Sequence, residues 1–291
     1  MARNLPVLLS QVASRYPNEA PQQLRSELLE LLEDFPASRL VVYPEFHTVR
    51  VNGGPEQRRE EYEACAEPLD GPRVTALRDL GREAGAWLVP GTVIERGDDG
   101  EMYNTALAIG PNGEFFSYRK IFPWRPFEPF RPGQDLVTFD IPDIGRVGLA
   151  ICYDIWYPEI IRNLAWMGAE LIVVPAQTST IDREQELILA RASAIQNQVF
   201  VAAANAAEPV GTGRSIIVDP EGLVRVQAPS ESAAVVTDVI NFDAVTRVRE
   251  YGTCGLNRMW SQSRPGDPSI TLPMYGGQLE SNALGAAPAH D

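Results

Sequence analysis

The sequence has little histidine and little cysteine, and this scarcity limits the chemistry open to it. Among 291 residues there are two histidines, His47 and His290, and three cysteines, Cys65, Cys152 and Cys254. No two cysteines stand at the spacing of zinc ligands, so we expect no structural metal site. An odd number of widely separated cysteines is typical of a reducing compartment, and we expect the protein to be cytoplasmic.

Long hydrophobic runs and an excess of positive charge are also missing. No apolar stretch approaches the length of a membrane span, and residues 1–6 lead into a predicted strand without the hydrophobic region of a secretory signal. With a formal net charge of −14, the chain lacks the basic face that binding to nucleic acid or to an anionic membrane requires. We therefore expect neither kind of partner.

The order of the predicted elements indicates an α/β fold. Strands and helices alternate and then give way to strands, first over residues 6–118 and again, after a proline-rich loop, over residues 147–240. Two such series predict two mixed sheets, each covered by helices on one face, and stacking the free faces buries both. We expect a four-layer αββα sandwich that forms a single domain over residues 1–262. The tail, residues 263–291, is expected to be irregular or to take part in oligomer contacts.

Cys152 stands where open α/β sheets gather their chemistry. It follows an apolar run, residues 147–151, that predicts a buried strand, and Pro158 begins a predicted helix soon after it. A cysteine at this place is either a core residue or a nucleophile. A nucleophilic thiol needs a base, and because His290 lies in the polar tail, that base is either His47 or a carboxylate.

Two further strand ends carry charged side chains. Glu45 follows Pro44 after the apolar run of residues 40–43, and Lys120 follows a β-like run over residues 114–118. Glu45 and Lys120 alone could form a buried ion pair that braces the strands. A carboxylate, an ammonium and a thiol at three strand ends favour an active site instead.

These charged and thiol side chains lie in the segments Pro44-Glu45, Tyr118-Arg119-Lys120 and Cys152-Tyr153-Asp154, the last followed by Pro158-Glu159. Together the segments resemble the Glu–Lys–Cys signature of the nitrilase (carbon–nitrogen hydrolase) superfamily. Their order and their spacings of 75 and 32 residues match the superfamily. The resemblance extends to about residue 260, and the fold that it implies is also the αββα sandwich.

The resemblance implies hydrolysis of a small carboxamide without a metal or other cofactor. In the implied mechanism Glu45 takes the thiol proton, Cys152 attacks the carbonyl carbon, and Lys120 and the N–H of Tyr153 hold the oxyanion. Glu45 then protonates the departing ammonia and activates the water that hydrolyses the thioester. We expect Glu45 to be largely desolvated and Lys120 to favour the thiolate.

Glu128 and three aromatic residues are the other candidate site residues. Glu128 could be a solvated loop charge, but Tyr-Arg-Lys-Ile-x-Pro-Trp with a glutamate eight residues past the lysine resembles the aliphatic amidase and formamidase branch. There this glutamate is a fourth catalytic residue that positions the substrate. We expect Phe46, Trp124 and Tyr153 to narrow the substrate pocket.

Several features set the alternatives apart. Many superfamily members carry a histidine two residues after the lysine, where this sequence has Phe122. An N-carbamoyl amide hydrolase typically has a basic residue soon after the cysteine, and a nitrilase has Cys-Trp-Glu; neither pattern is present. A catalytically inactive binding or scaffold protein is a further alternative. A glycosidase that uses Glu45 and Glu128 would leave Cys152 and Lys120 without a role.

We also expect a homodimer or a higher homo-oligomer. Superfamily members usually pair through the helix after the cysteine, and this helix is apolar on more than one face. Its apolar residues are Ile160, Ile161, Leu164, Ala165 and Met167.

Overall fold

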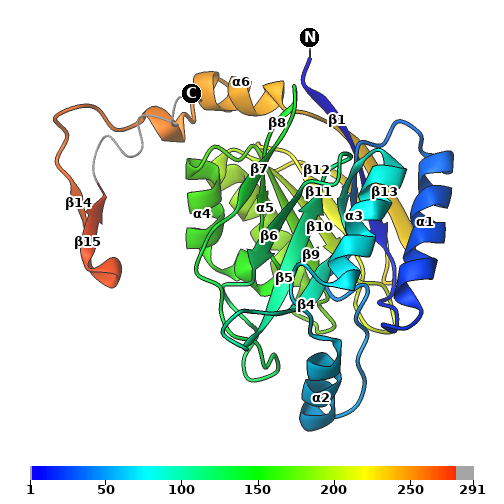
Figure 1. Cartoon of the computed structure of the whole chain (residues 1–291). Coiled ribbons are helices and arrows are strands. Elements are labelled where there is room, and N and C mark those ends of the chain that lie inside the picture. The colour runs from blue at the N-terminus through cyan, green and yellow to red at the C-terminus, as the bar shows by residue number, and fades with distance from the viewer. Residues whose placement is uncertain (1, 280–291) are drawn as a thin grey trace.

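The computed structural model describes residues 2–279, which form two β-sheets, the helices that cover them and a C-terminal hairpin (Figure 1). The first sheet has seven strands in the order β13-β1-β2-β3-β5-β4, with β6 paired to β5. Strands β1, β2 and β3 are parallel to one another, and the other pairings in this sheet are antiparallel. Its strands are β1 (Asn4–Gln11), β2 (Leu40–Val42), β3 (Trp87–Val89), β4 (Thr92–Arg96), β5 (Met102–Ile109), β6 (Phe115–Arg119) and β13 (Ala234–Asn241).

The second sheet has six strands in the order β12-β11-β10-β9-β8-β7. Strands β8, β9 and β10 are parallel, and the flanking pairs are antiparallel. Both sheets are therefore mixed, as the sequence predicts. The strands are β7 (Thr138–Ile141), β8 (Gly145–Leu149), β9 (Leu171–Ala176), β10 (Phe200–Asn205), β11 (Ile216–Val218) and β12 (Val224–Gln227).

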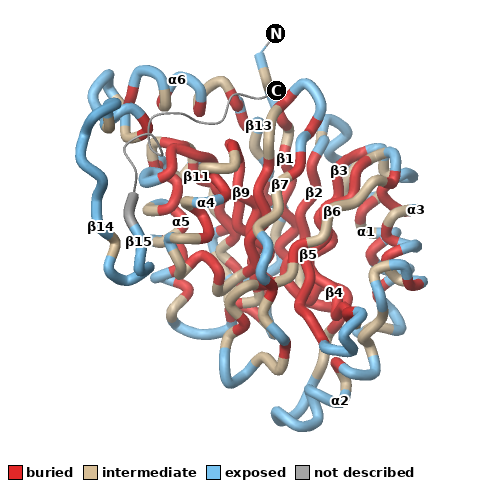
Figure 2. The backbone as a smooth tube through the Cα atoms, turned by 60° about the vertical axis from the view of Figure 1, so that its left-hand side comes forward, coloured by how far each residue is buried: buried red, intermediate tan, exposed pale blue. Residues whose placement is uncertain are grey.

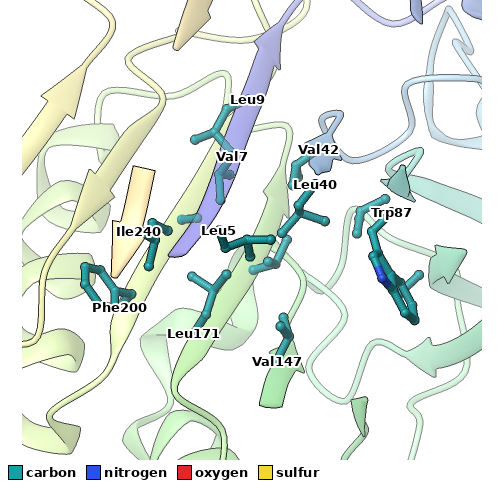
Figure 3. Packing of buried hydrophobic residues seen from close by; sticks show 14 of the residues in the cluster. Leu5, Val7, Leu9, Leu40, Val42, Trp87, Val147, Leu171, Phe200 and Ile240 are labelled. Carbon is teal, nitrogen blue, oxygen red and sulfur yellow. The ribbon is translucent and has the colours of Figure 1, made fainter. Parts of the chain in front are cut away.

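The inner faces of the two sheets pack on each other. In β1, Leu5, Val7 and Leu9 point toward the second sheet, whereas Leu8 points outward to the helices, as the period of two in a strand requires. The inner side chains meet residues such as Val147 and Leu171 of the second sheet (Figure 3). Figure 2 shows that buried residues are concentrated in the strands.

Helices cover both outer faces. Helices α1 (Ala20–Asp34) and α3 (Pro72–Ala84) pack on the first sheet, and α4 (Pro158–Trp166) and α5 (Arg183–Asn197) pack on the second. This layer order confirms the predicted αββα sandwich. Strand β13, from the second half of the chain, pairs with β1 and so joins the first sheet.

Some elements were not predicted from the sequence. Helix α2 (Pro55–Cys65) buries one side chain and has weak apolar periodicity, and helix α6 (Asp243–Tyr251) is short and buries Val245 and Val248. Strands β14 (Ile270–Leu272) and β15 (Gly277–Leu279) form a hairpin that extends from the body of the protein (Figure 1). The division into a domain at 1–262 and a tail at 263–291 stays a prediction, and residues 280–291 lie outside the described residues.

The apolar residues of α4 do not form the surface that the sequence predicts. Ile160, Ile161, Leu164 and Ala165 are at most 4% exposed, because they pack against the second sheet and α5 of the same chain. These four side chains therefore form no exposed apolar face, and pairing through α4 stays a prediction. None of the helices within residues 2–279 is both long and apolar enough to cross a membrane.

Candidate active site

The sheets bring the three predicted strand ends together. Glu45 follows β2, Lys120 follows β6, and Cys152 begins a short 3-10 helix, η1 (Cys152–Trp156), three residues after the end of β8. Two of these side chains therefore come from the first sheet and one from the second. Glu45 and Cys152 line one cavity at this edge of the sandwich. Lys120 donates a hydrogen bond to Glu45 there.

Lys120 is the centre of the polar contacts. Its Nζ donates to Oε1 of Glu45 at 2.9 Å and to Oε1 of Glu128 at 2.7 Å, and its side chain is 0% exposed. The structure thus places Glu128 beside the other two charges rather than in solvent, and its side chain is 11% exposed. Lys120 is also the only lysine in the sequence, where 24 of the 25 cationic side chains are arginine.

The carboxylate of Glu45 is held by three donors. Oε1 accepts a second hydrogen bond from the Asn104 side chain at 2.8 Å, and Oε2 accepts one from the backbone N–H of Gln177 at 3.1 Å. Glu45 is 1% exposed, which agrees with the predicted desolvation. Donors from both sheets therefore fix one carboxylate orientation.

Cys152 has a left-handed backbone conformation with φ of +45°. Non-glycine residues adopt this region rarely and at an energy of about 1–3 kcal/mol, so the surrounding structure has to impose it. Phe46, directly after Glu45, also has a positive φ of +54°. Backbone strain is thus present at Cys152 and directly after Glu45.

Asp154 provides the contacts that hold this turn. Its carboxylate accepts from the backbone N–H groups of Ile151 and Phe122, both at 2.9 Å, and from the Tyr118 hydroxyl at 2.8 Å. Tyr118 and Phe122 flank Lys120, so Asp154 ties the cysteine segment to the lysine segment. The sequence motif Cys-Tyr-Asp contained this residue, but its structural role was not predicted.

Burial and the neighbouring charges shift the pKa of Cys152. Burial raises the pKa of the thiol well above its usual value and Glu45 adds to this shift, although Lys120 opposes it. Lys120 therefore favours the thiolate, as predicted, whereas burial and Glu45 favour the neutral thiol. Burial opposes the charge of Lys120, yet Glu128 and Glu45 raise its pKa well above the usual value. Burial also raises the pKa of Glu128, and Lys120 counteracts that shift.

A cavity of about 100 Å³ lies between these side chains. Glu45, Cys152 and Glu128 line it, and so do the predicted pocket residues Phe46, Trp124 and Tyr153. Sequence reasoning missed the lining residues that come from α2 and from the segment between β9 and α5. These are Arg58 and Tyr62 from α2, and Gln177, Thr178, Ser179, Thr180, Asp182 and Glu186 from the second segment and the start of α5.

Comparison with known proteins identifies the family. A sequence model described as carbon-nitrogen hydrolase matches residues 10–250. The chain belongs to the carbon-nitrogen hydrolase family. It is therefore a hydrolase that acts on carbon–nitrogen bonds.

Named relatives of this carbon-nitrogen hydrolase agree with the predicted amidase branch. Hydrolase Rv0480c of Mycobacterium tuberculosis is 33% identical over 237 residues, which cover 73% of this chain and 81% of the relative. Omega-amidase NIT2 of Homo sapiens is 34% identical over 191 residues, or 60% of this chain and 68% of the relative. A formamidase of Bacillus cereus is 30% identical over 222 residues, which cover 74% of this chain and 66% of the relative.

Solved structures share the fold of this carbon-nitrogen hydrolase. Nit3 of Saccharomyces cerevisiae, a member of branch 10 of the nitrilase superfamily, has a TM-score of 0.77 at 25% identity and covers 85% of this chain and 94% of its own. An amidase from Nesterenkonia sp. has a TM-score of 0.68 at 23% identity, and the match covers 86% of this chain and 94% of the amidase. Both agree with the αββα architecture described above.

His47, the alternative base, is not part of the cavity lining. It is 0% exposed and stacks on Tyr43 with 4.6 Å between ring centroids. Neither ring nitrogen has a hydrogen-bond partner among the described residues. Burial, together with the charge of Arg15, lowers the pKa of His47 to about 3, so the ring is neutral in the folded protein. The structure gives His47 a packing role.

This buried histidine makes the stability of the carbon-nitrogen hydrolase depend on pH. An unfolded histidine has a pKa of about 6.5, whereas the folded value is about 3. The stabilisation is fully present above the unfolded value, and falls by about 1.4 kcal/mol per pH unit as the pH drops from 6.5 toward the folded value. His47→Phe keeps the ring stacking and removes the titration.

We predict that the variant gains about 2 kcal/mol over the wild type at pH 5, relative to their difference at pH 7.5. Urea unfolding of both proteins at the two pH values measures this change. Parallel pH profiles for the two proteins would show that His47 already binds a proton in the folded state.

Proposed function

We propose that this carbon-nitrogen hydrolase is an amidase that cleaves a small carboxamide to a carboxylic acid and ammonia through a cysteine thioester. The proposal depends above all on the buried ammonium of Lys120, which bridges Glu45 and Glu128 beside the Cys152 thiol. A thiol, a carboxylate and an ammonium in a desolvated cavity supply the nucleophile, the proton shuttle and the oxyanion stabiliser that acyl transfer requires.

The first half of the reaction forms the thioester. The proton of the Cys152 thiol passes to the Glu45 carboxylate, and Sγ bonds to the carbonyl carbon as the C=O electron pair moves to oxygen. Lys120 has three N–H donors, of which two bind carboxylates in this structure, and the third is free for the oxyanion. The backbone N–H of Tyr153, in the first turn of η1, supplies a second donor. Collapse breaks the C–N bond, and Glu45 returns its proton to the leaving ammonia.

The second half hydrolyses the thioester. Glu45 takes a proton from water while the water oxygen bonds to the carbonyl carbon. The C–S bond then breaks, the acid leaves, and the sulfur regains its proton from Glu45. The same carboxylate therefore acts as base and acid in both halves, which fits the way three donors fix its position.

The size of the cavity supports a small acyl group. About 100 Å³ is well below the roughly 300–1,000 Å³ of sites for drug-sized ligands. Relatives named formamidase and omega-amidase are consistent with a carboxamide substrate rather than a nitrile. The aromatic side chains of Phe46, Trp124 and Tyr153 would exclude bulky or peptide-like amides.

Replacement of the nucleophile tests the proposal. Cys152→Ala should abolish ammonia release from a panel of short aliphatic, aromatic and carbamoyl amides and nitriles, because no thioester can form. Intact-mass analysis of the wild type should show the acyl-enzyme. Cys254→Ala, which removes an exposed thiol, is the matched control. Turnover by Cys152→Ala would refute the thioester, and an inactive wild type would favour a binding or scaffold protein.

Glu128 has the contacts expected of a residue that orients the amide. Its Oε1 accepts from Lys120, whereas Oε2 is buried and has no hydrogen-bond partner among the described residues. Glu128 lines the cavity, and its backbone N–H donates to the carbonyl of Trp124. We infer that Oε2 accepts an N–H of the substrate carboxamide.

Glu128→Gln should separate turnover from thiol reactivity. Glutamine can still accept from Lys120, but its amide nitrogen cannot accept from a substrate N–H. We predict that hydrolysis falls about a hundredfold or more, while iodoacetamide still alkylates Cys152. Asp135→Asn, an exposed position in the same loop, should keep wild-type rates. Near-native hydrolysis by Glu128→Gln would make Glu128 a structural partner of Lys120 only.

We also infer that the enzyme is cytoplasmic and self-associates. The cysteines are all free, and apolar side chains at a spacing of seven lie exposed along α5 and just before it. Ile181, Ile188 and Ile195 are 97%, 66% and 46% exposed. A row of exposed apolar side chains on one helix face is typical of an interaction surface.

Substitution on this row should change the oligomeric state. Ile188→Glu combined with Ile195→Glu should convert a homodimer or larger assembly to monomer in light scattering at micromolar concentration. Val239→Glu, an exposed valine on β13, is the control and should not dissociate it. A wild-type monomer would contradict this interface, and so would an oligomer that stays intact in the Ile188→Glu, Ile195→Glu double variant.

A further inference from the structure

A second buried carboxylate lines the cavity and has no role in the reaction proposed above. Glu186 lies in the first turn of α5 and is 4% exposed. It belongs to the second sheet's helix layer, whereas Glu45 and Glu128 follow strands of the first sheet. Its charge also contributes to the raised pKa of Cys152, after burial and Glu45.

A hydroxyl connects Glu186 to the nucleophile. Thr178 Oγ1 donates to Oε2 of Glu186 at 2.6 Å and lies 3.8 Å from Sγ of Cys152, within reach of a weak sulfur hydrogen bond. Arg183 Nη1 donates to the same Glu186 oxygen at 2.9 Å. The three side chains form a chain of contacts from carboxylate to hydroxyl to sulfur.

Thr178 and Glu186 are held in place by contacts with residues outside the cavity. The backbone N–H of Thr178 donates to Asn205 Oδ1 at 2.8 Å, and Asn205 donates to the carbonyl of Gly213 at 2.9 Å. Arg183 donates to the carbonyls of Gly213 and Arg214 at 3.1 and 3.0 Å. Thr178 and Glu186 therefore share a common anchor in the segment before β11.

The hydrogen-bond inventory fixes the direction of the contact with sulfur. A threonine hydroxyl has one proton, and a carboxylate can only accept. Because Thr178 gives its proton to Glu186, its oxygen presents only lone pairs to Cys152. The sulfur must then be the donor, which a thiol can be and a thiolate cannot. A thiolate here would face lone pairs and, behind them, a carboxylate.

We propose that Glu186 is a positioning residue that acts through Thr178 and keeps Cys152 an oriented, neutral thiol until an amide occupies the cavity. This rests on Cys152 being the nucleophile, as proposed above. The charged groups that act on the thiol are Glu45, Glu128 and Glu186, opposed by Lys120, with Arg183 partly compensating Glu186. The thiol then loses its proton only when a substrate is bound, as the sulfur electron pair forms a bond to the carbonyl carbon.

The competing explanation is structural. Glu186 could serve only to hold Arg183 against the backbone at Gly213 and Arg214. Its loss would then lower stability but would not change the protonation of Cys152. The pH profile of thiol modification separates these explanations, and it does not require that the amide substrate be known.

The test measures the rate of Cys152 modification by methyl methanethiolsulfonate against pH, by intact mass, with Cys152→Ala as the blank for the other thiols. Glu186→Gln should shift the profile to lower pH by about one unit, which makes modification about tenfold faster below the midpoint. Glu184→Gln removes a charge from the same helical turn at an exposed position, and should leave the profile unchanged.

Variants of Thr178 test whether the effect passes through the hydroxyl. In a Thr178→Ser background, Glu186→Gln should give the full shift, because serine keeps the hydroxyl. In a Thr178→Val background the shift should shrink to about threefold or less, because only the through-space charge of Glu186 then acts on the thiol. A full shift in the valine background, or no shift from Glu186→Gln in the wild type, would overturn the proposal. Amide turnover without any such shift would overturn this inference alone, and a shift without turnover would overturn the amidase function alone.

Discussion

The buried ammonium of Lys120 between Glu45 and Glu128 is the interaction on which the rest of the site depends. Three charges are removed from water at this point, and a buried charge without a partner is strongly destabilising. The arrangement holds because each charge has a neighbour of opposite sign at 2.9 Å or less. Two carboxylates around one ammonium also leave a negative excess, which adds to the effect of burial in raising the pKa of the neighbouring Cys152 thiol.

The sandwich supplies the rigidity that such an arrangement requires. Strand ends place Glu45, Lys120 and Cys152 at one edge, and the closely packed layer between the sheets fixes their relative positions. Asp154 adds a local clamp, because its carboxylate joins the cysteine turn to the lysine segment by three hydrogen bonds. These contacts offset the energy cost of the left-handed backbone conformation at Cys152. The fold thus stabilises a conformation that the isolated turn would not adopt.

Much of this site could be predicted from the sequence, and the missed parts share a physical cause. Glu45, Lys120 and Cys152 follow apolar runs whose pattern indicates buried strands, so their places at strand ends were readable. Helix α2, which contributes Arg58 and Tyr62, is polar and buries one residue, so no apolar periodicity marks it. The contact of Thr178 with Glu186 depends on anchors at Asn205 and Gly213, which only the folded chain brings together. The apolar residues of α4 marked a core helix, and sequence alone could not separate this from an interface, because both bury the same kind of side chain.

The choice of lysine at the centre follows from the geometry. Every other cationic side chain in the sequence is arginine, and arginine presents its donors in a rigid planar fork. Lysine carries a compact charge with three donors that can point in different directions. Two of them reach carboxylates on separate segments, and in the reaction that we propose the third binds the oxygen that becomes negative. The single lysine therefore stands where one compact charge is shared between carboxylates on two separate segments.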